Sequence, residues 1–105
     1  MVVEAGYPFS LVNIDSADNI FDTTSQLPGY QISKIDQRRF MVDMTKTVLK
    51  NGGEGVIYWE PSWISTPCRT KWGKGSHYEN ATFFDPENGN EALPVFDFYD
   101  ESNYE

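Results

Sequence analysis

The chain has few of the side chains that build disulfides, zinc sites and nucleic-acid surfaces. Its 105 residues contain one cysteine, Cys68, and one histidine, His77. A single cysteine excludes an intrachain disulfide, and together with one histidine it does not supply a zinc ligand set. Eight basic residues stand against sixteen acidic ones, for a formal net charge of −8. That balance argues against nucleic acid and anionic membrane surfaces as partners, and the acidity itself is typical of a solvated surface.

Long apolar runs are lacking as well. No stretch of the sequence reaches the length of a transmembrane helix, so we predict no membrane span. Met1 is followed directly by Val2, Val3 and Glu4, without the basic start and apolar run of an export signal. A chain of 105 residues fits one small domain. A complete (β/α)8 barrel, by contrast, needs about 250 residues.

Aromatic side chains are the informative excess, with seven Phe, six Tyr and three Trp. Several of them crowd one polar middle segment: Tyr58, Trp59, Trp63, Trp72 and Tyr78. Trp and Tyr gathered in loops with Pro, Gly and Ser are typical of a surface on which sugar rings stack. Ordinary packing explains such a cluster equally well, so both interpretations stay open at this point.

The order of apolar and polar segments predicts an α/β fold with two strand–helix units. The expected elements are a strand at about 2–7, a long loop at 9–31, a helix at about 34–50, a strand at about 55–59, a long loop at 61–89 and a short helix at about 91–100. Strand, helix and strand in this order predict a crossover between parallel strands. Both long loops follow the carboxyl ends of strands, which is where α/β folds bind ligands.

Local signals set the expected helix ends. Ser33 is the predicted N-cap of the long helix, with Asp36 completing a capping-box variant, and the Asn51–Gly53 segment supplies a left-handed stop. The expected apolar face of this helix consists of Ile35, Phe40, Met44, Thr47 and Val48, flanked by Met41 and Leu49. The short final helix is expected to be capped by Asn90, with Pro94 in or near its first turn.

Two residues at predicted strand ends are candidates for function. Glu4 lies late in a buried strand, where a carboxylate is unfavourable unless it is paired or used. Trp59 ends the second strand and would place an indole at the floor of a cleft. The alternatives are a salt-bridged strand end for Glu4 and simple packing under the loop for Trp59.

Three segments in this order resemble the end of glycoside hydrolase family 53, the arabinogalactan endo-β-1,4-galactanases of clan A. They are Val-Val-Glu-Ala-Gly-Tyr-Pro (2–8), Gly-Val-Ile-Tyr-Trp-Glu-Pro-Ser-Trp (55–63) and Gly-Ser-His-Tyr-Glu-Asn-Ala-Thr-Phe-Phe-Asp (75–85). An Ala-Leu-Pro sequence follows, and the likeness runs from Val2 to about Phe98. The family often has Thr at the position of Ala5 and Trp at that of Tyr78, and the 66–69 stretch is irregular.

The resemblance implies that residues 1–105 form the last two βα units, strands seven and eight, of a TIM (β/α)8 barrel, as an incomplete C-terminal fragment. It implies a retaining hydrolase of β-1,4-galactan in which Glu4 is the nucleophile. The acid/base glutamate of the family lies on strand four, upstream of this sequence. The chain alone is therefore expected to be inactive.

The resemblance also implies further site residues. Trp59 would stack under the sugar, and Trp63 and Tyr7 would form cleft walls. Glu60 and Asn80 would orient sugar hydroxyls or, equally, brace the loops. No cofactor is required for this chemistry.

A structural calcium ion is the remaining cofactor expectation, because bacterial members of the family hold calcium in these loops. Asp15, Asp18 and Asn19 are the candidate ligands, since calcium prefers oxygen donors. A solvated acidic loop explains the same residues.

The implied partners are β-1,4-galactan and either the remainder of the barrel or a second copy that pairs through exposed strand edges. The family implies secretion or a place in the bacterial cell envelope or periplasm. The rival hypothesis is a non-catalytic glycan-binding or interaction module that uses the Trp and Tyr surface.

Overall fold

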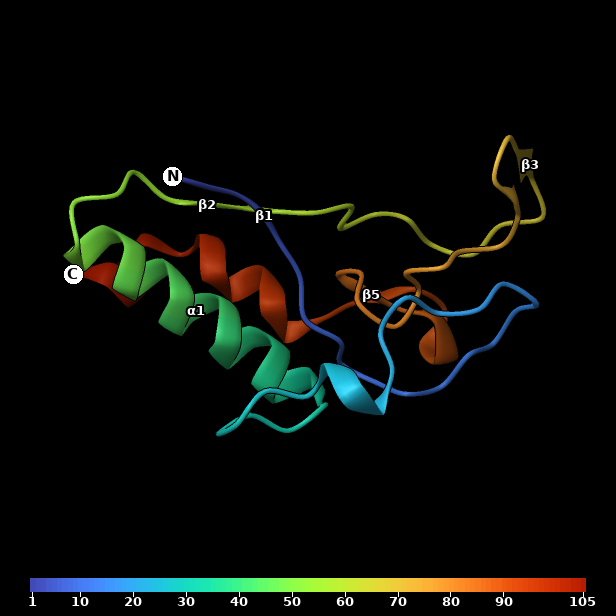
Figure 1. Ribbon diagram of the computed structural model, residues 1–105, viewed down its shortest axis with the longest axis horizontal. Coiled ribbons are helices and arrows are strands. Elements are labelled where there is room, and N and C mark those ends of the chain that lie inside the picture. The colour runs from blue at the N-terminus through green and yellow to red at the C-terminus, as the bar shows by residue number, and fades with distance from the viewer.

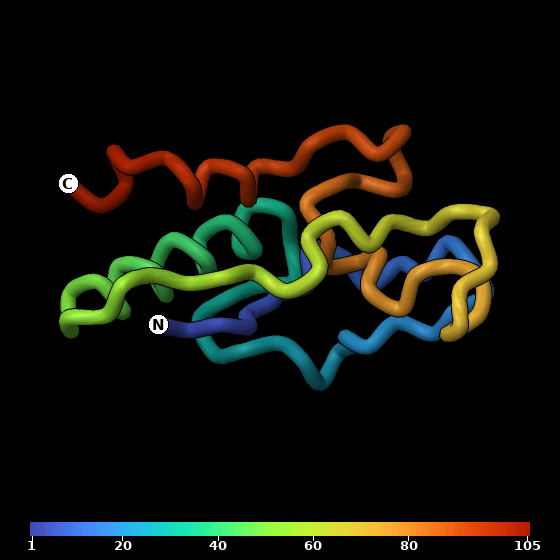
Figure 2. The backbone as a smooth tube through the Cα atoms, turned by 90° about the horizontal axis from the view of Figure 1, so that it is seen from above, coloured from blue at the N-terminus to red at the C-terminus, as the bar shows by residue number.

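Two short parallel strands lie side by side, and one long helix connects them, in a computed structural model that describes residues 1–105 (Figure 1). The elements are β1 (Val2–Ala5), η1 (Thr23–Ser25), α1 (Lys34–Lys50), β2 (Val56–Tyr58), β3 (Arg69–Thr70), β4 (Gly73–Lys74), β5 (Phe84–Asp85), η2 (Pro86–Asn88), β6 (Glu91–Ala92), η3 (Pro94–Tyr99) and η4 (Glu101–Tyr104). The body is elongated, 41 × 26 × 24 Å, with helices and both termini toward one end and loops toward the other (Figures 1 and 2).

The β1–β2 ladder is shorter than the two predicted strands. Val2 pairs with Val56 and Ala5 with Tyr58, with an irregularity between them. The backbone N–H of Trp59 still donates to the carbonyl of Ala5 at 2.7 Å. Beyond that point the N–H of Tyr7 donates to the Tyr58 hydroxyl instead of to a strand. A side-chain acceptor thus replaces the ladder where the chain turns toward the core.

Helix α1 begins and ends at local capping signals. The Ser33 hydroxyl accepts the Asp36 N–H at 3.1 Å, which satisfies one of the free donors of the first turn. Asn51 caps the other end, and Gly52 follows with a left-handed φ of 82°. The carboxylate of Asp36 is not part of a capping box, contrary to the prediction, because it accepts from the Gln31 N–H and from Arg39.

The buried face of α1 differs from the predicted one. Its buried residues are Gln37, Phe40, Met41, Val42 and Thr45. Ile35 is 63 % exposed, so the predicted apolar face is rotated from the buried face. Gln37 lies at the centre of this buried face, where an apolar residue would be expected. Its burial is possible because its amide donates to the Tyr58 hydroxyl and to the backbone carbonyls of Ala81 and Thr82.

The C-terminal segment packs along α1, and Figure 2 shows the two running side by side. The predicted final helix is a 3-10 helix, η3, that begins at Pro94 with Leu93 as its N-cap. Asn90 is not the cap: it has a left-handed φ of 58° in the turn between β5 and β6. The predicted loop 61–89 is also more ordered than expected, since it contains the β3–β4 hairpin and β5.

The hydrophobic core lies between the strands, α1 and the C-terminal segment. Its members are Ala5, Tyr7, Phe9, Phe40, Met41, Val42, Tyr58, Tyr78, Ala81, Phe83, Leu93, Val95 and Phe98. Val3 is 68 % exposed and Ile57 is 51 % exposed, so part of the strand pair is apolar and uncovered. No helix is both long enough and apolar enough to cross a lipid bilayer.

Candidate active site

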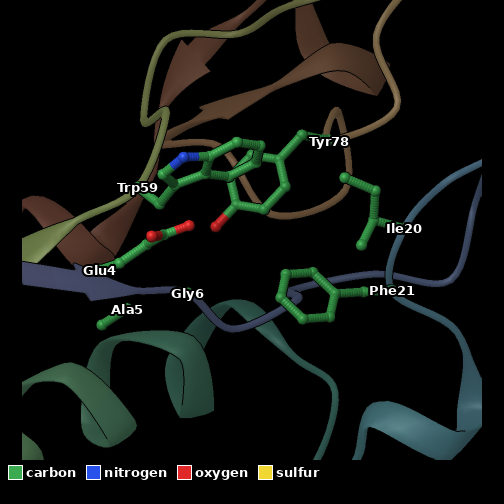
Figure 3. Close-up of a pocket in the computed structure, with 7 residues that line it drawn as sticks. All are labelled: Glu4, Ala5, Gly6, Ile20, Phe21, Trp59 and Tyr78. Atoms are coloured by element: carbon green, nitrogen blue, oxygen red, sulfur yellow. The ribbon is translucent and has the colours of Figure 1, made fainter.

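A pocket opens at the carboxyl ends of β1 and β2. Glu4, from β1, and Trp59, directly after β2, both line it (Figure 3). Its other lining residues are Ala5, Gly6, Ile20, Phe21 and Tyr78. The pocket measures about 480 Å³, within the range of about 300–1,000 Å³ typical of small-molecule sites. Glu4 is solvent-exposed, so its carboxylate is accessible to a ligand in this pocket.

Trp59 stands at the boundary between this pocket and a second one. Its ring meets Tyr78 edge-on at a centroid distance of 4.9 Å and Trp63 at 6.0 Å. These aromatic contacts hold the half-buried indole in place while it still lines both pockets. The structure thus brings the predicted residues Glu4 and Trp59 together in one concave site.

The second pocket is aromatic and lies under the β3–β4 hairpin. It is lined by Ile20, Trp59, Glu60, Trp63, Thr70, Trp72 and His77. Trp72 is 67 % exposed, so a flat ligand can reach its ring. Glu60 has a left-handed φ of 46°, a conformation that is strained for a residue other than glycine. The predicted site residues Trp63 and Glu60 therefore lie in this pocket and not beside Glu4.

Two other predicted site residues do not face either pocket. Tyr7 is only 2 % exposed and stacks on Phe40 at 4.8 Å, so the prediction that it forms a cleft wall is wrong. Asn80 is 1 % exposed, and its amide donates to the carbonyls of Ser10 and Phe21. Of the two roles considered for Asn80, the structure supports loop bracing.

Direct hydrogen bonds tie the first long loop (residues 9–31) to the second (residues 61–89). The Ser76 N–H donates to Asp15 at 2.7 Å, and the Ile14 N–H donates to Glu79 at 2.6 Å. The Ile20 N–H donates to the carbonyl of His77 at 2.7 Å. Because these bonds lie next to the pocket wall, they fix both loops as one unit.

The candidate calcium ligands take part in hydrogen bonds within the two loops. The carboxylate of Asp15 already accepts the N–H groups of Ala17 and Ser76. The amide of Asn19 donates to Val12, and Asp18 contributes a backbone carbonyl to His77. No three His, Cys, Asp or Glu side chains are grouped so that they could hold a metal. Loop bracing accounts for the Asp15 carboxylate and for the Asn19 amide nitrogen, while the buried Oδ1 of Asn19 has no hydrogen-bond partner in the chain. The calcium site therefore stays a prediction.

The neighbouring carboxyl groups of Glu79 and Asp15 have pKa values shifted in opposite directions. Burial raises the pKa of Glu79, and the charge of Asp15 adds to this effect, while the Ile14 N–H opposes it. Burial also acts to raise the pKa of Asp15, but hydrogen bonds from Ser65, Ser76 and Ala17 outweigh it and leave this pKa below its usual value. The ionised form of Glu79 is therefore disfavoured in the folded chain.

Glu79→Gln is expected to stabilise the chain at neutral pH. A carboxyl group whose pKa is raised by folding binds more protons in the folded state than in the unfolded state. As the pH rises above 4.5, the ordinary pKa of a glutamate, Glu79 therefore lowers the free energy of unfolding. Glutamine keeps an acceptor for the Ile14 N–H and lacks this charge. Urea unfolding should show the variant's advantage over the wild type growing from pH 4 to pH 7.

The exposed Glu54→Gln variant is the matched control for this experiment and should show no such trend. An advantage of Glu79→Gln that is equal at both pH values would contradict the role assigned to the Glu79 charge.

Several pocket residues were not among the sequence candidates, including two from each long loop. Ile20 and Phe21 come from the first loop, and Tyr78 and His77 from the second. The available signal for Ile20 and Phe21 was an isolated apolar pair within a run of Asp, Asn, Ser and Thr.

The comparisons with known proteins agree with this geometry. Residues 1–99 match the sequence profile described as glycosyl hydrolase family 53. The chain is 48 % identical over 99 residues to an arabinogalactan endo-beta-1,4-galactanase from Cellvibrio japonicus, covering 94 % of this chain and 26 % of that protein. It is 37 % identical over 90 residues to an uncharacterized protein in the bgaB 5′ region of Niallia circulans, covering 80 % of this chain and 24 % of that protein.

A solved structure gives the same result. The Ignisphaera aggregans GH53 catalytic domain matches with a TM-score of 0.81 and 28 % identity, over 99 % of this chain and 30 % of that one. This likeness assigns the fold to a TIM-barrel family, of which the chain contains a part. The chain spans about a quarter of the length of the curated relatives it matches. The chain therefore belongs to glycosyl hydrolase family 53.

Proposed function

We propose that this chain supplies strands seven and eight of an endo-β-1,4-galactanase barrel, with Glu4 as the catalytic nucleophile. The observation that carries the proposal is the shared pocket of Glu4 and Trp59 at the carboxyl ends of two adjacent parallel strands. Active sites of (β/α)8 barrels lie at this end. The substrate assignment is supported by the name of the Cellvibrio japonicus relative, which is 48 % identical.

The proposed reaction is a retaining double displacement. A carboxylate oxygen of Glu4 attacks the anomeric carbon, the glycosidic C–O bond breaks, and a second carboxylic acid protonates the leaving oxygen. That second group then removes a proton from water, and the water oxygen attacks the anomeric carbon and releases Glu4. Trp59, on the same pocket wall, would provide the apolar surface on which the sugar ring stacks.

The second carboxylic acid would come from the part of the barrel that lies outside residues 1–105. Retaining geometry places the two carboxyl groups about 5–5.5 Å apart. Glu79 is buried and braces Ile14, and Glu60 lines the other pocket, so neither is a suitable partner for Glu4.

The partner of the strand pair would be the remainder of the barrel or, failing that, a second copy of this chain. The β1–β2 sheet has only two strands, so the outer edge of each strand carries no β ladder. Unpaired backbone groups at such edges readily recruit further strands. Exposed Val3 and Ile57 would be covered in the same assembly.

We also propose that the parent protein works outside the cytoplasm, in the medium or in the cell envelope or periplasm. The reason is the size of the proposed substrate. An enzyme cuts a polysaccharide only in the compartment that holds the intact polymer. Fractionation of the source cells with an antibody against this chain would test the proposal, and a purely cytoplasmic signal would contradict it.

A second candidate function is a glycan-binding module without chemistry. The observation that favours it is the second pocket, in which Trp59, Trp63 and Trp72 offer aromatic surface away from Glu4. This candidate predicts that the chain binds galacto-oligosaccharides and that Glu4 is irrelevant to every measurable property.

The experiment compares two proteins on β-1,4-galactan. One is the 105-residue chain. The other is a chimera in which this chain replaces the matching 99-residue region of the Cellvibrio japonicus galactanase. We expect the chimera to release oligosaccharides and the chain alone to release none, because only the chimera has both carboxyl groups. Chromatography of the products provides the measurement.

Turnover by the chain alone would contradict the division of the two catalytic groups between this chain and the rest of the barrel. A folded chimera that binds galactan without cleaving it would favour the binding module.

A further inference from the structure

The hydroxyl of Tyr78 is a buried hydrogen-bond donor without a partner. Tyr78 is 1 % exposed, and its Oη has no hydrogen-bond partner in the chain. An unpaired buried hydroxyl destabilises a fold, because it has lost its hydrogen bonds to water. The ring is nevertheless held by aromatic neighbours, with Trp59 at 4.9 Å, Phe21 at 5.6 Å and Tyr58 at 6.3 Å between centroids. The packing therefore keeps this donor at a defined place.

That place is the wall of the pocket that contains Glu4. Figure 3 shows the Tyr78 hydroxyl and the Glu4 carboxylate turned toward one another, with Trp59 beside them. Gly6 makes the approach possible, because a Cβ at Gly6 would lie only 2.1 Å from the Tyr78 Oη. The chain therefore has a glycine two residues after Glu4, at a position where any other side chain would clash with the Tyr78 phenol.

Other acceptors near Tyr78 are already engaged. The neighbouring Tyr58 hydroxyl accepts from Tyr7 and Gln37 and lies 2.5 Å from the carbonyl of Ala81, to which it donates. Burial raises the pKa of Tyr78 well above its usual value, and the adjacent Tyr58 hydroxyl and the charges of Glu4 and Glu60 add to the effect. The phenol therefore keeps its proton over the working pH range and acts as a donor.

We propose that Tyr78 is a positioning residue for the nucleophile: its O–H donates a hydrogen bond to the Glu4 carboxylate and orients the oxygen that attacks. This inference rests on the proposed function of Glu4. Hydrogen bonds to an ionised acceptor are roughly twice as strong as neutral ones. Catalytic hydrogen bonds are often long in the free enzyme and shorten when substrate is bound. The proton stays on Tyr78 throughout, so the bond positions Glu4 without changing its charge.

The shape of the side chain fits the same role. A phenol carries its donor at the far tip of the ring, where Figure 3 shows Glu4. The arrangement is therefore a property of this chain and its Gly6–Tyr78 contact.

The first test follows the Glu4 carboxyl carbon by NMR in the 105-residue chain across pH. Tyr78→Phe keeps the ring and removes only the unpartnered hydroxyl, so folding should be retained or improved. Losing a hydrogen bond to the carboxylate should shift the Glu4 carboxyl resonance from its position in the wild-type chain. Tyr99→Phe, at a tyrosine that is 61 % exposed, is the matched control and should leave it unchanged.

The second test needs no tyrosine variant. In the wild-type chain, the Cζ resonance of Tyr78 should shift with the same midpoint as the Glu4 carboxyl, and Glu4→Gln should abolish that shift. Independent behaviour of the two resonances would overturn the proposal, even if Tyr78→Phe fails to fold.

The third test separates this inference from the proposed function. In the chimera, Tyr78→Phe should lower kcat about tenfold and move the acidic limb of the pH–rate profile upward, with little change in KM. A wild-type chimera that cleaves galactan while Tyr78→Phe leaves kcat and the acidic limb unchanged overturns only the role of Tyr78. An inactive chimera, with the NMR coupling intact, overturns the proposed function and leaves the Tyr78–Glu4 hydrogen bond supported.

Discussion

The Glu4→Gln variant of the chimera is expected to lose galactan hydrolysis by about 10⁴-fold or more, the scale observed when a catalytic nucleophile is removed. Glutamine has the shape of glutamate, but its amide oxygen does not form the glycosyl-enzyme intermediate of a retaining mechanism. Glu4 is exposed and takes part in no salt bridge that the change would break. Folding and glycan affinity should therefore persist while kcat falls.

The measurement is the initial rate of reducing-end formation from β-1,4-galactan, with ligand affinity determined by calorimetry on the same samples. Glu54→Gln serves as the matched control, because Glu54 is exposed and lines neither pocket. Unchanged turnover in Glu4→Gln would end the nucleophile assignment. If affinity and turnover both remain as in the wild type, the result favours a glycan-binding module in which Glu4 has no role.

Phe83→Ala is expected to give the largest loss of stability, about 3–5 kcal/mol, the range for deleting a buried aromatic side chain. Phe83 is 1 % exposed and meets Tyr58 at 4.5 Å and Phe98 at 5.9 Å between centroids. Its backbone N–H donates to Pro61, and its carbonyl accepts from Leu93. Because small domains are stable by only about 5–15 kcal/mol, this loss is a large fraction of the free energy of unfolding.

Urea unfolding followed by tryptophan fluorescence measures this effect in the 105-residue chain. The control is Phe96→Ala, at a ring that is 39 % exposed and packs on Phe83 from outside. Its loss should be smaller, roughly 1–2 kcal/mol. Equal losses for the two variants would contradict the position of Phe83 at the centre of the core.

Features that depend on neighbouring residues could be predicted from the sequence, and features that depend on distant partners could not. Ser33 and Gly52 flank α1 where their side-chain and backbone chemistry predicts, because a cap acts within one turn. Gln37 was missed as a buried residue because its partners, Tyr58, Ala81 and Thr82, lie more than 20 residues away.

The candidate active site shows the same difference between local features and features that depend on distant residues. Glu4 and Trp59 were candidates because each occupies the end of a strand, a position that local pattern reveals. Tyr7 was misplaced because the chain leaves the ladder after Ala5, so strand alternation no longer indicates the direction of its side chain. Tyr78 was not singled out as a site residue, since only the folded chain brings it over Gly6.

The β3–β4 hairpin has a practical consequence for engineering specificity. The Cys68 N–H donates to the Thr66 hydroxyl, the Trp72 N–H donates to the Thr70 hydroxyl, and that hydroxyl donates to the Gly73 carbonyl. All of these side-chain hydrogen bonds stay inside the hairpin segment. The bonds that brace the Glu4 pocket lie outside this segment. Exchange of the hairpin as a cassette would therefore leave the bonds around the Glu4 pocket in place, so that loop grafts around Trp72 would change the second pocket alone.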